Sequence, residues 1–177
     1  MVFLFNKKKE EIIIGVDAGT TRIGYSILRV YKKKSENFSI SLISFGLLDI
    51  TEVEHHLRLK QIYREFNKLL KKYKPNKVIV ERLYFNLNAK TAMEVSQAVG
   101  VITLASALNN VFIDYITPTQ VKLIVANNGK ATKQEIAQKV KSFFDIQDKL
   151  IDDITDAIAI ALAFVIKEYS NNSNNNS

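Results

Sequence analysis

The sequence of 177 residues contains no cysteine and only two histidines, His55 and His56. Without cysteine the chain can form neither a disulfide framework nor a zinc site built on thiolates, which fits a cytosolic protein. The two histidines are adjacent on an expected helix and point in different directions, so a histidine-based metal site is not expected. Any bound metal would be held by oxygen ligands, and this favours Mg²⁺ or Mn²⁺.

Long uncharged hydrophobic runs are also missing. The chain begins MVFLFNKKKEE, a short apolar run with its charges behind it, whereas a secretory signal has its positive charges in front. No later stretch combines transmembrane length with an absence of charge. We therefore expect a cytoplasmic protein without a membrane partner.

Acidic residues are fewer than basic ones. The chain has 25 Lys and Arg against 18 Asp and Glu, which gives a formal net charge of +7 and a pI near 9.5. A balance of this kind indicates an anionic partner, and nucleic acid is the commonest one. The alternative is a lysine-rich surface that only keeps the protein in solution.

The length fits one domain with a sizeable core. We expect a flexible basic extension over residues 1–10, a single domain over residues 11–169, and a disordered tail over residues 170–177. The tail, SNNSNNNS, is of low complexity. No internal repeat or linker divides the domain.

Hydrophobic periodicity predicts an α/β fold with a five-stranded mixed sheet flanked by helices. Three successive strands with a charged hairpin tip indicate an antiparallel meander, and two later strands separated by helices indicate parallel pairing. The expected strands cover residues 12–17, 23–31, 38–50, 77–81 and 111–116. The expected helices cover residues 53–73, 89–108 and 152–169, with two more that begin at Pro118 and after Thr132.

Two of the apolar strands end on a carboxylate, Asp17 and Glu81. If these strands are parallel neighbours, both acids lie at the same edge of the sheet. A buried acid needs a hydrogen bond, a basic partner or a cation, because an isolated carboxylate is costly to desolvate. For Asp17 alone, capping of the following glycine turn is the alternative.

Two further acids, Asp153 and Asp156, lie three residues apart at the start of the last helix, so they share one face. We expect Asp152 to be the N-cap and Asp153 the first helical residue. Acids in a first turn also gain from the helix dipole, which is the structural alternative. A buried segment, AIAIAL, follows Asp156, and an acid at the margin of such a helix is reasonable if it faces a cation.

Brought together, these four carboxylates would repel one another unless divalent cations lay between them. Two Mg²⁺ ions about 3.5 to 4 Å apart would neutralise the acids and support in-line cleavage of a phosphodiester. In a basic chain this predicts a metal-dependent nuclease. Lys130 and Lys133, at the start of a helix, are weak candidates for a phosphate site.

The order of strands, helices and acids resembles the RNase H-like nuclease fold, and within it the RuvC family of Holliday junction resolvases. The segments that carry the resemblance span residues 12–167 and read GVDAGTTRIGYSIL, VIVERLYFNLNAKTAMEVSQAVG, PTQVKLIVANNGKATK and DDITDAIAIALAF. The resemblance implies an endodeoxyribonuclease that resolves four-way junctions by symmetric paired nicks in recombination and repair. It assigns the metal ligands to Asp17, Glu81, Asp153 and Asp156, with two Mg²⁺ per site or Mn²⁺ in their place.

The resemblance also implies DNA contacts. Tyr84 falls where the family has a phenylalanine near the junction crossover, and stacking on a base suits either ring. Lys122 and Lys133 match basic residues near the scissile phosphate. Exposed basic residues near these motifs add further expected phosphate contacts: Arg82, Lys90 and Lys130. The sequence leaves open whether Asp114 joins the metal site.

In this family a homodimer carries two active sites, and the helix after the second motif helps to form it. We therefore expect residues 88–108 to carry part of a dimer interface, with a branch-migration motor of the RuvA and RuvB type as a possible further partner. Two alternatives remain at this point. One is another RNase H-like nuclease of the YqgF type, linked to ribosomal RNA processing. The other is a nucleotide-binding relative of the actin-like ATPases, which share a Gly-Thr-Thr turn.

Overall fold

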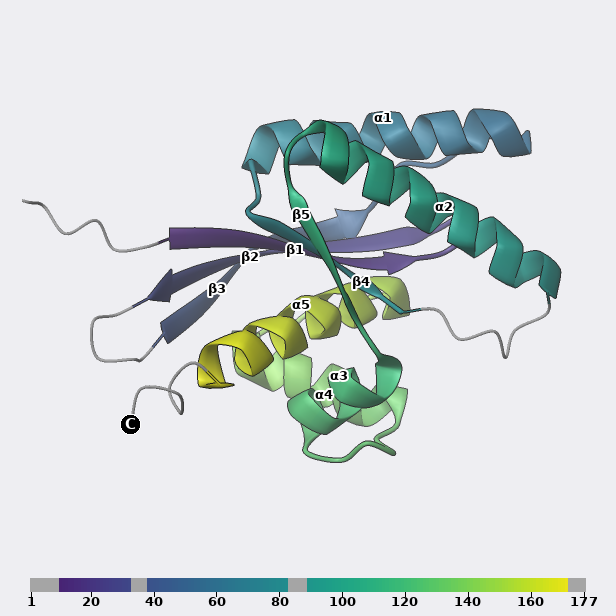
Figure 1. The fold of residues 1–177 in the computed structure, drawn as a ribbon. Coiled ribbons are helices and arrows are strands. Elements are labelled where there is room, and N and C mark those ends of the chain that lie inside the picture. The colour runs from purple at the N-terminus through teal and green to yellow at the C-terminus, as the bar shows by residue number, and fades with distance from the viewer. Residues whose placement is uncertain (1–9, 33–37, 83–88, 172–177) are drawn as a thin grey trace, which may run out of the picture.

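The computed structural model describes residues 10–32, 38–82 and 89–171, and within it a five-stranded sheet lies between two layers of helices (Figure 1). The strands are β1 (Glu10–Ala18), β2 (Ile23–Lys32), β3 (Phe38–Leu47), β4 (Lys77–Glu81) and β5 (Phe112–Ile116). The helices are α1 (His55–Tyr73), α2 (Ala89–Leu108), α3 (Pro118–Ala126), α4 (Lys133–Phe144) and α5 (Asp152–Asn171).

The sheet has the order β3-β2-β1-β4-β5. The first three strands are antiparallel, and β4 and β5 continue the sheet in parallel with β1. This is the predicted topology. It arises because the short hairpins can join only antiparallel strands, whereas β1, β4 and β5 are separated by helices long enough to cross over.

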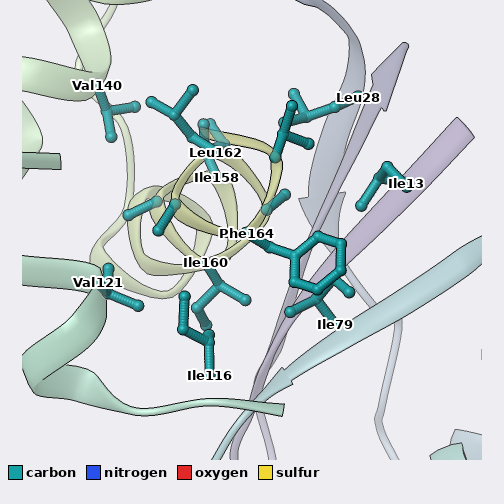
Figure 2. Close-up of a cluster of buried hydrophobic side chains, with 14 of the residues drawn as sticks. Ile13, Leu28, Ile79, Ile116, Val121, Val140, Ile158, Ile160, Leu162 and Phe164 are labelled. Atoms are coloured by element: carbon teal, nitrogen blue, oxygen red, sulfur yellow. The ribbon is translucent and has the colours of Figure 1, made fainter. Parts of the chain in front are cut away.

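Helix α5 is the centre of one layer. Its residues from Ile158 to Val165 are all buried, as expected for the apolar segment that follows Asp156. Ile158, Ile160, Leu162 and Phe164 pack among side chains from the sheet and from α3 and α4 (Figure 2). Close packing of α5 on β1 depends on Gly15, because a Cβ there would lie 2.3 Å from the carbonyl oxygen of Ala157.

Helices α1 and α2 cover the opposite face of the sheet (Figure 1). Ile62, Phe66 and Leu70 of α1 are buried against this face, as their helical spacing predicts. Helix α1 ends at Tyr73, where Lys74 takes a left-handed conformation (φ 47°) and Pro75 follows. On α2 five small or branched residues are buried, and the last three of them belong to the core between the helices and the sheet: Ala92, Val95, Ala98, Ile102 and Ala105.

The predicted helix starts at Pro118 and Thr132 are confirmed. Thr117 caps α3 and Thr132 caps α4, each in a reciprocal capping box with the residue three positions on, Gln120 and Glu135. The cap predicted at Asp152 is wrong by one residue. The carbonyl of Ile151 accepts from the backbone N–H groups of Ile154 and Thr155, so Asp152 is already inside α5.

Several boundaries differ from the predicted ones. β3 ends at Leu47 instead of residue 50, and α1 begins at His55 instead of residue 53. The loop between them is held by the Gln61 side chain of α1. This side chain accepts from the N–H groups of Thr51 and Glu52 and donates to the carbonyl of Asp49. Glu10 pairs with β2 and so belongs to β1, not to the extension expected over residues 1–10. α5 continues to Asn171, past the predicted start of the tail. The rest of the predicted extension and tail lies outside the described residues.

Candidate active site

Asp17 and Glu81 lie at the carboxyl ends of β1 and β4, which are parallel neighbours. Val16 pairs with Val80 in this ladder, so the two acids that follow them stand at the same edge of the sheet. This is the placement expected from the two strand patterns. The carboxyl ends of β1 and β4 therefore bring two carboxylates together, and we name this side of the sheet the acidic edge.

The acids open into a hollow of about 320 Å³ between this edge and the helices below it. Asp156 of α5 joins Asp17 and Glu81 in its lining, and so do two lysines, Lys122 and Lys133. The apolar part of the lining comes from α3, α4 and α5: Pro118, Val121, Ile136 and Ile160. One hollow thus holds three carboxylates and two ammonium groups on an apolar floor.

The Asp17 carboxyl group has a pKa raised from 3.8 to about 7. Burial is the largest cause, and the negative charges of Asp156, Glu81 and Asp153 add to it, while Lys133 acts in the opposite direction. The pKa of Glu81 is also raised, first by burial and then by Asp156. The negative charge of these acids is therefore not balanced by nearby positive charge, and a bound cation would balance it.

The side chains of Lys133 and Asp156 form an ion pair. The Lys133 Nζ lies 2.9 Å from Asp156 Oδ2, and this hydrogen bond is the main reason that the pKa of Lys133 is raised. Lys133 is the first residue of α4, and the Thr132 cap fixes where that helix begins. The capping box thus places an ammonium group at the entrance to the hollow.

Asp153 does not line the hollow, although its charge acts on Asp17, and it has a different partner. Its Oδ2 is 3.0 Å from the Arg22 side chain, in the turn between β1 and β2. Its backbone lies against Gly24, where a Cβ would stand 1.9 Å from the Asp153 carbonyl oxygen. Among the described residues, no three Asp, Glu or His side chains are arranged as they stand to hold a metal ion. Asp153 and Asp156 instead have basic partners.

The other predicted site residues are placed as follows. Arg82 and Lys130 are exposed and do not line the hollow. Asp114 is exposed on the edge strand β5, where its side chain accepts from the N–H of Tyr115, so it does not join the acids. Tyr84 and the side chain of Lys90 lie outside the described residues.

Arg22 is the functional candidate that the sequence did not predict. An arginine in a Gly-Thr-Thr turn directly after an acid-bearing strand was the available signal. It gave no indication of the partner, because Asp153 is more than a hundred residues away and meets Arg22 only through the packing of α5 on β2. A second arginine, Arg58, has a mostly buried side chain that donates to the Val53 carbonyl at 2.7 Å and thereby holds the loop before α1.

Comparisons with known proteins identify the family. A family model described as crossover junction endodeoxyribonuclease RuvC matches residues 13–164. A protein with this description from Brachyspira hyodysenteriae is 37% identical over 153 residues, which is 86% of this chain and 92% of the relative. Another from Fusobacterium nucleatum is 37% identical over 155 residues, 86% of this chain and 79% of the relative.

Solved structures agree on the fold. The RuvC of Thermus thermophilus superposes with a TM-score of 0.80 at 24% identity, over 90% of this chain and 96% of that one. A second structure, of the same protein in complex with a Holliday junction substrate, gives the same TM-score over 91% of this chain and 96% of that one. The sheet and its helices therefore form an RNase H-like nuclease fold. The chain belongs to the RuvC family of crossover junction endodeoxyribonucleases, and the family favours the resolvase interpretation over both alternatives.

Proposed function

We propose that this chain cleaves phosphodiester bonds at the crossover of four-way DNA junctions. The observation that carries the proposal is the acidic edge of the sheet, where Asp17 has a pKa of about 7 among three further carboxylates, in a chain of net charge +7. A basic protein attracts DNA phosphates, and the acidic edge supplies the ligands for the cations that phosphodiester cleavage uses. Relatives across the family carry the name of this activity.

The proposed metal ligands are Asp17, Glu81, Asp153 and Asp156. Their chemistry fits Mg²⁺, which prefers carboxylate oxygens, and the raised pKa values of Asp17 and Glu81 mark uncompensated negative charge. Metal binding would compete with the hydrogen bond from Lys133 to Asp156 and with the ion pair of Arg22 and Asp153, whose buried Oδ2 accepts no hydrogen bond from the described residues. When bound, two Mg²⁺ ions would activate water and stabilise the leaving 3′ oxygen.

The chain's own basic residues would hold the scissile phosphate. Lys122 and Lys133 lie in the same hollow as the acids, so an ammonium group can reach a phosphate whose ester bond lies over Asp17. Once Asp156 turns away, Lys133 is free to donate to a phosphate oxygen and to stabilise the charge that develops there. Arg82, Lys90 and Lys130, with Tyr84 at the crossover, remain proposed DNA contacts.

We propose a homodimer that forms through α2. Along its outer side Met93, Gly100, Leu104 and Leu108 follow one another at helical spacing, and the three apolar side chains are 56% to 63% exposed. A Cβ at Gly100 would meet nothing within 4 Å, so this stripe has room for a closely packed second helix. By length and composition alone, residues 91–108 would also suit a membrane span, but an interface between two copies accounts for the same apolar surface. A branch-migration motor remains a further proposed partner.

The experiment is a nicking assay on a labelled four-way junction and a linear duplex of matched sequence, each with Mg²⁺ or with chelator. The proposal expects metal-dependent nicks at the junction and none in the duplex. Cleavage of an RNA substrate with the junction left intact would move the function to another RNase H-like nuclease.

A further inference from the structure

A second basic surface lies outside the candidate active site, on the outer side of α1. Four basic residues occur there on successive turns: Lys60, Arg64, Lys68 and Lys71. Steps of four, four and three residues keep them on one face of a helix. We name these four residues the α1 ridge.

The α1 ridge faces solvent. All four of its residues are exposed, whereas the opposite face of α1 buries Ile62, Phe66 and Leu70 in the core. In the described part of the chain, one carboxylate pairs with the ridge: Glu65, which lies 3.0 Å from Arg64 and 2.7 Å from Lys68. Most of the positive charge of the ridge therefore remains available to an anionic partner.

The direction of α1 relates the ridge to the candidate active site. β3 and β4 flank α1 in the chain, and β4 ends at the acidic edge, so α1 begins at that edge and runs back toward the opposite one (Figure 1). Lys60 is thus nearest the acidic edge and Lys71 farthest from it. At a rise of 1.5 Å per residue the ridge is about 16 Å long, which matches about five base pairs of duplex.

From this geometry we infer that the α1 ridge binds the phosphate backbone of a junction arm as that arm leaves the active site. The inference rests on the proposed function and adds to it a contact remote from the cleaved bond. A duplex arm suits the ridge because the four basic side chains form a line, and the phosphates of a duplex backbone also form a line. A compact anion could contact only part of this line. Contacts of this kind add affinity without sequence preference.

Two structural explanations compete with this inference. Lys71 in the last turn also interacts favourably with the helix dipole, and Lys68 pairs with Glu65. Both would give the ridge a role in the stability of α1 alone. A binding measurement separates them from DNA contact, because neither predicts that the ridge changes how junction binding depends on salt or on the length of a DNA arm.

The test variant is Lys60→Gln/Lys68→Gln/Lys71→Gln, which removes three charges and keeps good helix formers. The matched control is Lys139→Gln/Lys141→Gln/Lys167→Gln, which removes three charges from α4 and α5 on the other side of the sheet. Circular dichroism melts first establish that both variants fold. Binding to four-way junctions is then measured in chelator over a range of salt, with arms shortened stepwise.

For the ridge variant we expect the slope of log K against log salt to fall by about 2 to 3, at roughly 0.9 per lost phosphate contact. The difference in affinity between the ridge variant and the unmodified chain should vanish once the arms are too short to reach the ridge. We expect it to disappear as the arm is shortened by about five base pairs. The control should bind as the unmodified chain does. Equal binding by the ridge variant and the control at every arm length would overturn the inference. The ridge would then bind an acidic protein or only be solvated. Failure of the unmodified chain to bind any junction would instead overturn the proposed function.

Discussion

Lys133 Nζ lies 2.9 Å from Asp156 Oδ2, so a basic residue from α4 holds an acid of α5 across the mouth of the hollow. The Lys133 side chain is 70% exposed and that of Asp156 is 28% exposed. An ion pair in such a solvated position contributes little to stability, on the order of 1 kcal/mol or less. Its position beside Asp17 and Glu81 gives it more weight in the chemistry of the site than in the fold.

Lys133→Gln should therefore separate activity from stability. We expect the rate of junction nicking to fall about a hundredfold, the scale on which a donor to developing charge acts, and the melting temperature to change little. Lys139→Gln is the matched control, because Lys139 is exposed on the same helix and does not line the hollow. An equal loss of activity in both variants would show that general attraction to DNA, and not contact at the scissile phosphate, explains the effect of Lys133.

Asp17 should make the stability of the metal-free protein depend on pH. The folded-state pKa of about 7 lies above the ordinary value of 3.8, so the folded protein keeps this proton over a pH range in which the unfolded chain has lost it. The contribution of Asp17 to stability is therefore fully present below about pH 4 and is lost as the pH rises through 7. The difference between a pKa of 3.8 and one of about 7 corresponds to at most about 4 kcal/mol of unfolding free energy.

Asp17→Asn removes this ionisable group. In chelator, the variant should melt several degrees above the unmodified chain at about pH 8.5, and the difference should shrink at about pH 5. Thermal unfolding at both pH values measures this. If the difference in melting temperature between the two proteins is the same at both pH values, the raised pKa of Asp17 is contradicted.

Two glycines should respond in opposite ways to the same substitution. A Cβ at Gly15 would lie 2.7 Å from the Ala161 Cβ and closer still to the Ala157 carbonyl, so Gly15→Ala must displace α5 from the sheet. We expect a loss of about 1 to 3 kcal/mol or more. Gly100 is in the interior of α2 with open space around it, so Gly100→Ala should raise the intrinsic stability of the helix by up to about 1 kcal/mol. Chemical denaturation at a protein concentration low enough to keep the chain monomeric measures both values, and a loss of the same size at Gly100 would contradict the open stripe on α2.

The proposed dimer can be tested on the same stripe. Leu104 is 56% exposed at its centre, and Leu104→Asp places a charge where a second apolar helix would pack. We expect this variant to be monomeric by light scattering, and to cut one strand at a time instead of making paired nicks. Leu123→Asp on α3 is the control, since Leu123 is 53% exposed and does not belong to the stripe. If Leu104→Asp stays dimeric, the interface lies elsewhere.

The fold was predictable because its signals are local. Apolar strands, hairpins, capping residues and Pro75 each act within a few residues, and the parallel pairing of β1 with β4 follows from the long crossover between them. The same logic placed Asp17 and Glu81 at one edge. The start of α5 was not predictable from a capping side chain, because a backbone group closes the first turn: the Ile151 carbonyl accepts from the N–H groups of Ile154 and Thr155 and from the Thr155 hydroxyl.

The partners of the acids were not predictable. The sequence shows four carboxylates in suitable elements, but the ion pairs from Arg22 to Asp153 and from Lys133 to Asp156 depend on how closely α5 packs against β2 and α4. That approach is set by Gly24, whose missing side chain makes room for the Asp153 backbone. Contacts of this kind join residues far apart in the chain, and no local pattern encodes them.

The most direct test of the central claim is a comparison of Asp17→Asn with the unmodified chain on one labelled four-way junction. Binding is measured by titration in chelator and cleavage after addition of Mg²⁺. We expect Asp17→Asn to bind the junction at least as tightly as the unmodified chain and to leave it uncut, because the variant keeps the basic surface and loses one carboxylate of the acidic edge. If Asp17→Asn folds, binds and still cuts at the rate of the unmodified chain, the acidic edge is not the catalytic site.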